Sequence, residues 1–223
     1  MSVGPKAAGF AVIGRVFYES FGTVQADWTP LLIGISILSM AVGNIMAILQ
    51  KNLKRLLAYS SIAHAGYALL GVIAGTGEGM NAMMTYMLIY AFMNIGAFGV
   101  IILMDCRNDV NDFNGLSKNH PAVAALMLIF MFALTGIPPT AGFVGKFNVF
   151  LAAINAGYTW LVVIAVFFSA ISAYYYLRVV MNMYMKPGGI QLRIEAFPSV
   201  LAALFIAGLA VCVLGIIPSM VIL

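Results

Sequence analysis

Long apolar runs, separated by short polar connections, make up most of the chain. Seven of them lie at about 5–22, 31–50, 56–75, 81–104, 121–154, 158–184 and 196–220. A helix needs roughly 20 apolar residues to cross the hydrocarbon core of a membrane, and the runs are near or above that length. The pattern predicts an all-α membrane protein with about seven transmembrane helices, forming a single transmembrane domain over residues 1–223.

The fifth run, 121–154, is too long for one straight span. As a continuous helix it would measure about 51 Å at 1.5 Å per residue, whereas a hydrocarbon core is about 30 Å thick. Pro138 and Pro139 lie in its middle, lack backbone N–H groups and disfavour helix before them. We therefore expect one broken helix, made of two half-helices joined by an unwound stretch. Such breaks persist at membrane depth only inside protein or beside a watery cavity, and they are typical of transport sites.

Charge is scarce and unevenly distributed. The chain is 63% hydrophobic and 8% charged, whereas soluble domains are about 25% charged. Eight of the 11 basic residues fall in alternate connections, at Lys51, Lys54, Arg55, Arg107, Lys118, Arg178, Lys186 and Arg193. The opposite connections carry Glu19, Asp27 and Glu78, with Arg15 nearby. The positive-inside rule then predicts a cytoplasmic N-terminus and an outer C-terminus, and it explains the net charge of +4 without nucleic acid.

Lys146 is the principal candidate for chemistry, because it follows the helix break by one turn. An ammonium at this depth costs a few kcal/mol unless it is compensated. A lysine near a helix end can extend to the membrane surface, but Lys146 lies well inside its run. We expect it to carry protons, with Gly142 and Gly145 letting another helix or water approach.

Lys6 and His64 are the other candidate proton-relay residues. Lys6 follows Pro5 at the start of the first run, where a basic residue at a cytoplasmic helix end is the simpler interpretation. His64 lies within the third run and shares a helix face with Ser60. A histidine can pass protons near neutral pH, or it can form a neutral hydrogen bond to another helix.

Two rows of smaller polar residues could support a water chain or simply join helices. They are Tyr86, Tyr90 and Asn94 in the fourth run, and Ser169, Ser172 and Tyr176 in the sixth. All the carboxylates lie in or beside connections, so a buried lysine must be neutral, hydrated or paired with another chain. Nucleotide, haem and metal motifs are not found, and Cys106 and Cys212 lie too far apart to suggest a metal site or disulfide framework.

Several runs of sequence together resemble the antiporter-like membrane subunits of respiratory complex I, most closely subunit N, the bacterial counterpart of mitochondrial subunit 2. The runs are GNIMAILQ at 43–50, NLKRLLAYSSIAHAGY at 52–67, ALTGIPPTAGFVGKF at 133–147 and SAYYYLR at 172–178. The resemblance covers essentially the whole chain, although members of the family are about twice as long.

The resemblance implies proton translocation coupled to NADH:quinone electron transfer in a bacterial inner membrane. It makes 1–22 the last helix of a first repeat, 31–184 a second, inverted five-helix repeat with Lys146 in its broken helix, and 196–220 a C-terminal helix. Lys6, in GPKAAGF at 4–10, then links two half-channels, and His64 is a relay between them. NADH, FMN, iron–sulfur clusters and quinone would be held by partner subunits, and this chain would hold no cofactor.

Two alternatives remain open at this point. One is a cation/proton antiporter subunit of the related multisubunit exchangers, whose motifs overlap with these. The other is a structural membrane fragment that assembles but does not conduct. The first repeat, with its own lysine and the glutamate that pairs with it, does not occur in these residues, so the half-channel completed by Lys146 would depend on further protein.

Overall fold

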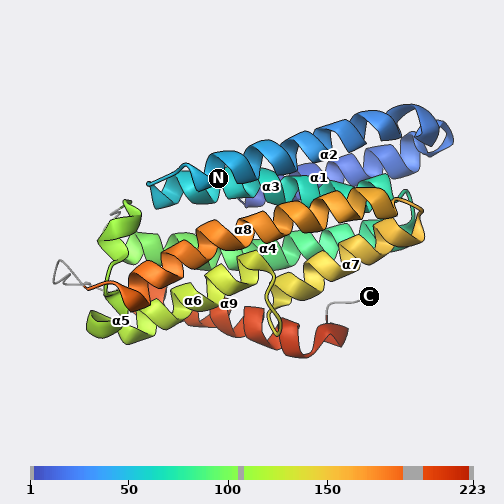
Figure 1. Ribbon diagram of the computed structural model, residues 1–223. Coiled ribbons are helices and arrows are strands. Elements are labelled where there is room, and N and C mark those ends of the chain that lie inside the picture. The colour runs from blue at the N-terminus through green and yellow to red at the C-terminus, as the bar shows by residue number, and fades with distance from the viewer. Residues whose placement is uncertain (1–2, 105–107, 188–197, 221–223) are drawn as a thin grey trace.

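The computed structural model describes residues 3–104, 108–187 and 198–220, except for the side chains of 19, 23, 198 and 220. Within these ranges the chain folds as a bundle of helices (Figure 1). The main helices are α1 (Gly4–Arg15), α2 (Gln25–Ile48), α3 (Leu53–Ile73), α4 (Gly77–Leu103), α6 (Pro121–Thr135), α7 (Ala141–Asn155), α8 (Thr159–Met185) and α9 (Pro198–Ile216). Shorter helical segments are Val16–Ser20, Gly22–Val24, Val110–Phe113, α5 (Leu116–Asn119) and Pro218–Met220.

Helices α3 and α4 form the centre of the bundle, and most of their residues are buried. Helix α2 packs closely along α3 because glycines remove side chains from the contact. A Cβ on Gly43 would lie 2.5 Å from the backbone nitrogen of Ala63, and one on Gly66 would lie 2.7 Å from the Met40 side chain. Small residues of this kind let membrane helices approach one another closely.

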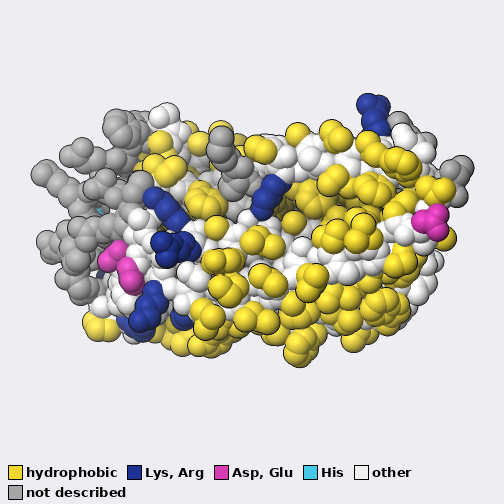
Figure 2. All heavy atoms as spheres, turned by 90° about the horizontal axis from the view of Figure 1, so that it is seen from above, with side chains coloured by type: hydrophobic (Ala, Val, Ile, Leu, Met, Phe, Trp, Pro, Cys, Tyr) yellow, Lys and Arg dark blue, Asp and Glu magenta, His cyan; other side chains and the backbone are white. Residues whose placement is uncertain are grey.

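The outer surface of the bundle is apolar. Helices α2, α3, α4, α8 and α9 are each long and apolar enough to cross a membrane, while α6 and α7 are shorter apolar helices. Leu38 on α2, Val163 on α8 and Leu209 on α9 are all largely exposed, and hydrophobic side chains cover much of the face in Figure 2. These features confirm the predicted all-α, multi-pass membrane fold with one broken helix.

Some predicted boundaries were wrong. Helix α2 starts at Gln25 rather than near 31, because its first turn is polar and carries Asp27, which stabilises the helix N-terminus. Arg178 does not lie in a connection but inside α8, which continues to Met185. Its guanidinium donates to the carbonyls of Ile48 and Gln50 and so joins α8 to the end of α2.

The connections at the basic end of the bundle are joined by hydrogen bonds. The amide of Leu53 donates to the Asn108 carbonyl over 2.5 Å, and the amide of Val110 donates to the Lys51 carbonyl over 2.9 Å. In Figure 2 most of the visible Lys and Arg side chains lie toward one end. Arg107, Arg193 and Cys106 lie outside the described residues, and Cys212 is a partly buried free cysteine on α9.

The helix break is present where the prolines predict it, between α6 and α7. Helix α6 ends at Gly136, whose φ of 89° is left-handed and favours glycine. A Cβ on Gly142 would lie 1.7 Å from the carbonyl oxygen of Ala133, so the first turn of α7 lies directly against the last turn of α6. A Cβ on Gly215 of α9 would lie 2.1 Å from the Pro139 carbonyl oxygen, so α9 packs against one side of the unwound stretch. The side chains of Pro138 and Pro139 themselves are exposed.

Candidate functional site

Lys146 is buried on α7, with 5% of its surface exposed. Its Nζ donates to the carbonyls of Leu134 at 3.1 Å and Thr135 at 2.8 Å, and to Ser169 Oγ at 2.9 Å. Leu134 and Thr135 are the last residues of α6, whose terminal carbonyls lack partners within the helix. The C-terminal end of a helix carries partial negative charge and favours a cation. Within the described residues, the helix break itself therefore supplies two of the three polar partners of Lys146, and α8 supplies the third.

Gly136 makes room for this arrangement as well as ending α6. A Cβ at Gly136 would lie 3.1 Å from Lys146 Cδ and 3.5 Å from its Nζ. Gly145, which was expected to let another helix approach, lies against Tyr86 of α4. A Cβ on Gly145 would lie 2.8 Å from Tyr86 Cδ2. The glycines around Lys146 thus let helices α4 and α6 close around it.

An aromatic ring completes the surroundings of Lys146. Its Nζ lies over the Tyr67 ring, 5.1 Å from the ring centroid. The Tyr67 hydroxyl accepts a hydrogen bond from Asn44 Nδ2 at 3.2 Å, and Asn44 Oδ1 accepts one from the Tyr175 hydroxyl at 3.0 Å. Sequence reasoning did not single out Tyr67, Asn44 or Tyr175, because only the fold brings α2, α3 and α8 together here.

His64 is buried on α3 between two tyrosines from other helices. Its Nδ1 is 2.5 Å from the Tyr86 hydroxyl of α4, and its Nε2 is 3.1 Å from the Tyr176 hydroxyl of α8. Tyr176 is also 2.5 Å from Ser60 Oγ, one turn before His64. Each ring nitrogen therefore has a hydroxyl that can donate or accept a proton.

Lys6 lies half-buried on α1 and contacts α3. Its Nζ donates to the carbonyl of Ser61 at 3.0 Å and to Ser61 Oγ at 2.6 Å. Ser61, which Lys6 contacts, is the neighbour of Ser60, and Ser60 is hydrogen-bonded to Tyr176. Lys6 lies in the first turn of α1, and this contact ties that end of the helix to α3.

The three candidate residues lie along one polar band, but within the described part of the chain no hydrogen bond joins His64 to either lysine. The row on α8 divides between them: Ser169 bonds Lys146, and Tyr176 bonds His64. On α4, Tyr86 bonds His64, whereas the buried Tyr90 hydroxyl and Asn94 Nδ2 have no hydrogen-bond partner. Buried polar atoms of this kind are ordinarily satisfied by water.

A cleft of about 290 Å³ opens between α4 and α7, at the end of the bundle away from the basic connections. Its lining is mixed: Ala82, Leu151 and Ala152 are apolar, and the polar residues are Glu78, Asn81 and Thr85 of α4 with Asn148 and Asn155 of α7. The cleft therefore opens beside the two helices that carry Tyr86 and Lys146.

Within the described residues, no three His, Cys, Asp or Glu side chains cluster so that they could hold a metal ion. The chemistry that this arrangement can perform is proton transfer among amine, imidazole, phenol and hydroxyl groups. Each of these groups can both release and accept a proton or share one through a hydrogen bond.

Several known proteins are similar to this chain in sequence. NADH-quinone oxidoreductase subunit N 1 of Thermodesulfovibrio yellowstonii is 54% identical over 215 residues, which cover 96% of this chain and 46% of that protein. Subunit N of Trichlorobacter lovleyi is 49% identical over 226 residues, covering 99% and 46% respectively. The chain therefore spans a little under half the length of these relatives.

Solved structures agree with the sequence comparison. A chain of respiratory complex I from Thermus thermophilus with bound aureothin matches with a TM-score of 0.79 at 37% identity, over 86% of this chain and 44% of that one. A chain of the Mrp complex from Dietzia sp. DQ12-45-1b matches with a TM-score of 0.85 over 97% and 49%, but at 18% identity it speaks only for the fold. Residues 1–172 match the family described as NADH:quinone oxidoreductase/Mrp antiporter, TM. The chain belongs to this family of membrane proteins.

Proposed function

We propose that this chain forms a proton-translocating part of an NADH:quinone oxidoreductase, with Lys146 as its principal proton-carrying residue. The observation that carries the proposal is a buried lysine whose amine has three hydrogen-bond acceptors at a helix break. The similarity to subunit N sequences supports the same function. Electron transfer, and the NADH, FMN, iron–sulfur clusters and quinone that it requires, would belong to partner subunits.

The surroundings of Lys146 can hold both of its protonation states. An ammonium has three N–H donors, which match the carbonyls of Leu134 and Thr135 and the hydroxyl of Ser169. A neutral amine has two donors and one lone pair. It can keep both carbonyls and accept a hydrogen bond from Ser169, whose hydroxyl rotates to donate. Ser169 is therefore the one partner that can exchange a proton with Lys146.

The polar band suggests how protons move between the candidate residues. On one side, Lys6 bonds Ser61; in the middle, Tyr86, His64, Tyr176 and Ser60 form a continuous hydrogen-bonded row. Waters would bridge the remaining gaps, one of them beside the unpartnered hydroxyl of Tyr90. The cleft between α4 and α7 would connect this band to the outer side.

The finer assignments belong to the same proposal. Helices α2 to α8 would be the second of two inverted repeats, α1 the last helix of the first repeat, and α9 the C-terminal helix. The basic end would face the bacterial cytoplasm, with the C-terminus outside, in the inner membrane. Other membrane subunits of the complex would be the partners, since chains of complex I are among the solved structures that match.

The experiment that tests this function uses the assembled oxidoreductase containing this chain in proteoliposomes. NADH oxidation and proton movement are recorded together, in sodium-free and sodium-containing buffer. We expect NADH-driven proton translocation that does not require sodium. If NADH oxidation proceeds without any proton translocation, the proposed function is wrong.

The same measurement separates the alternatives. A cation/proton antiporter is a real second candidate, because the matching family includes Mrp antiporters. It predicts sodium- or potassium-dependent proton exchange without NADH. A non-conducting structural role predicts that the complex assembles and that substitutions of Lys146 leave proton movement unchanged.

A further inference from the structure

Tyr67 lies directly beneath the ammonium of Lys146 and takes part in none of the proton transfers described above. The Nζ-to-centroid distance of 5.1 Å is within the roughly 6 Å over which a cation is attracted to the face of an aromatic ring. The attraction is stronger when the pair is shielded from water. Both residues are buried here, since 1% of Tyr67 and 5% of Lys146 is exposed.

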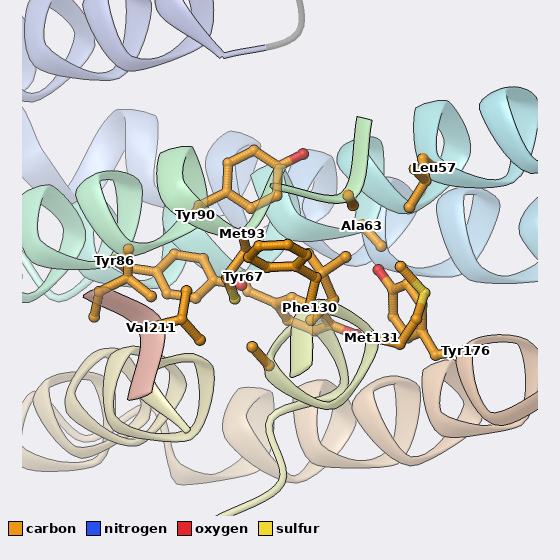
Figure 3. Close-up of a cluster of buried hydrophobic side chains, with 14 of the residues drawn as sticks. Leu57, Ala63, Tyr67, Tyr86, Tyr90, Met93, Phe130, Met131, Tyr176 and Val211 are labelled. Carbon is orange, nitrogen blue, oxygen red and sulfur yellow. The ribbon is translucent and has the colours of Figure 1, made fainter. Parts of the chain in front are cut away.

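The ring is held in this orientation from several sides. Asn44 of α2 donates to its hydroxyl, and Tyr175 of α8 fixes Asn44 in turn. Asn44 Nδ2 also donates to the Met40 carbonyl of its own helix at 2.7 Å, which limits how the amide can turn. Phe150 of α7 packs edge-on against the ring, with centroids 6.2 Å apart. Figure 3 shows Tyr67 within a close cluster that includes Tyr86, Tyr90 and Phe130.

The same ring also lies beside the histidine. The His64 and Tyr67 rings are 5.8 Å apart and nearly perpendicular, at 86°. Tyr67 is therefore in contact with both relay residues, with its face toward Lys146.

We propose that Tyr67 is a positioning residue for proton translocation: its ring face stabilises the charged form of Lys146 in place of a carboxylate, and Asn44 and Tyr175 hold the ring in position. The ring face acts together with the α6 carbonyls. The two carbonyls and the Ser169 hydroxyl accept the three N–H groups of the Lys146 ammonium. The ring face stabilises the positive charge of the ammonium and offers no site that could take its proton. This inference rests on the proposed function of Lys146.

Fluorinated phenylalanines test the proposal, because fluorine withdraws electron density from the ring face while changing its size very little. Tyr67 is replaced by Phe and then by mono-, di- and trifluorophenylalanine in the assembled oxidoreductase. We expect Tyr67→Phe to keep most of the proton translocation per NADH, and each added fluorine to lower it, by about threefold or more in total. Tyr67→Leu, which has no ring, is expected to fall at least as far as the trifluorinated variant.

Two results would overturn the proposal. Equal translocation across the fluorinated series would mean that the ring only packs. A loss in Tyr67→Phe as large as that in Tyr67→Leu would mean that the hydroxyl matters and not the ring face. Lys146→Ala, measured in parallel, keeps the two proposals distinguishable: if it alone stops translocation while the fluorinated series stays level, only the inference about Tyr67 fails.

Discussion

The sequence does not show which groups would accept the hydrogen bonds of Lys146 inside the membrane. The carboxylates all lie in or beside the predicted connections, so the sequence predicts a neutral, hydrated or externally paired lysine. The structure instead places the amine at the end of α6, where two backbone carbonyls and a hydroxyl accept its hydrogen bonds. The missing partner is thus backbone, which a search for acidic side chains cannot find.

Ser169 provides a test of how Lys146 exchanges its proton. Among the partners of Lys146 in the described part of the chain, Ser169 is the one that can both accept from an ammonium and donate to an amine. Ser169→Ala removes this hydroxyl, whereas Ser169→Thr keeps it. We expect the Ala variant to lower proton translocation by about tenfold or more, as is common when a proton-transfer group is lost, and the Thr variant to retain it. The rate of proton uptake per NADH in proteoliposomes measures both. Equal losses in the two variants would mean that the size of the side chain at this position matters and that its hydroxyl does not exchange a proton with Lys146.

The site residues themselves were only partly predictable. Lys146, Lys6 and His64 stood out because charge or imidazole is rare within apolar runs. Tyr67 and Asn44 did not, since a tyrosine or asparagine in a span ordinarily joins helices by hydrogen bonds. Their roles depend on which helices meet, which no local pattern specifies.

At the scale of elements, the glycines of the break can be tested directly. Gly142→Ala would force a Cβ against the Ala133 carbonyl, and backbone cannot move aside as a flexible side chain can. We expect a loss of about 1–3 kcal/mol in stability, seen as a lower unfolding temperature in detergent. Gly34→Ala on α2 is the matched control, because no atom lies within 4 Å of its Cβ position. It should be neutral or slightly stabilising.

Arg178 offers a second test of how elements are joined. Its guanidinium reaches two carbonyls at the end of α2 from within α8. Lysine is a single point charge and does not reproduce that fork. Arg178→Lys is therefore expected to lower stability by about 1–3 kcal/mol, measured by the same unfolding assay. The exposed Lys186→Arg serves as control, and an Arg178→Lys variant as stable as the control would contradict the assigned anchoring role.

Hydropathy predicted some of the helix boundaries and missed others. The proline-broken fifth run was predicted correctly because Pro138 and Pro139 act locally on the backbone. The start of α2 was missed because Gln25 and Asp27 are polar, although they suit a helix N-terminus. Arg178 was assigned to a connection because charge ordinarily marks the end of a span, whereas here the fold supplies carbonyls for it to bind.

At the scale of the whole molecule, the orientation of the bundle across the membrane can be tested by labelling. Single cysteines introduced at Lys54 and Glu78, at opposite ends of the bundle, can be labelled with a membrane-impermeant maleimide. We expect the Lys54→Cys protein to react only when the cytoplasmic side is accessible, and Glu78→Cys to react from outside intact cells. The unmodified protein, with Cys106 and Cys212, gives the background labelling. The reverse pattern would contradict the positive-inside assignment, and with it the outward direction of the cleft between α4 and α7.

In the proposed function, protons cross the membrane by way of Lys146. This is tested by the number of protons translocated per NADH by the assembled oxidoreductase carrying Lys146→Ala, compared with the parent and with the exposed control Lys186→Ala. We expect the control to keep the parent value and Lys146→Ala to lose most of it, although the complex still assembles. An unchanged proton yield in an assembled Lys146→Ala complex would mean that protons do not cross by way of Lys146.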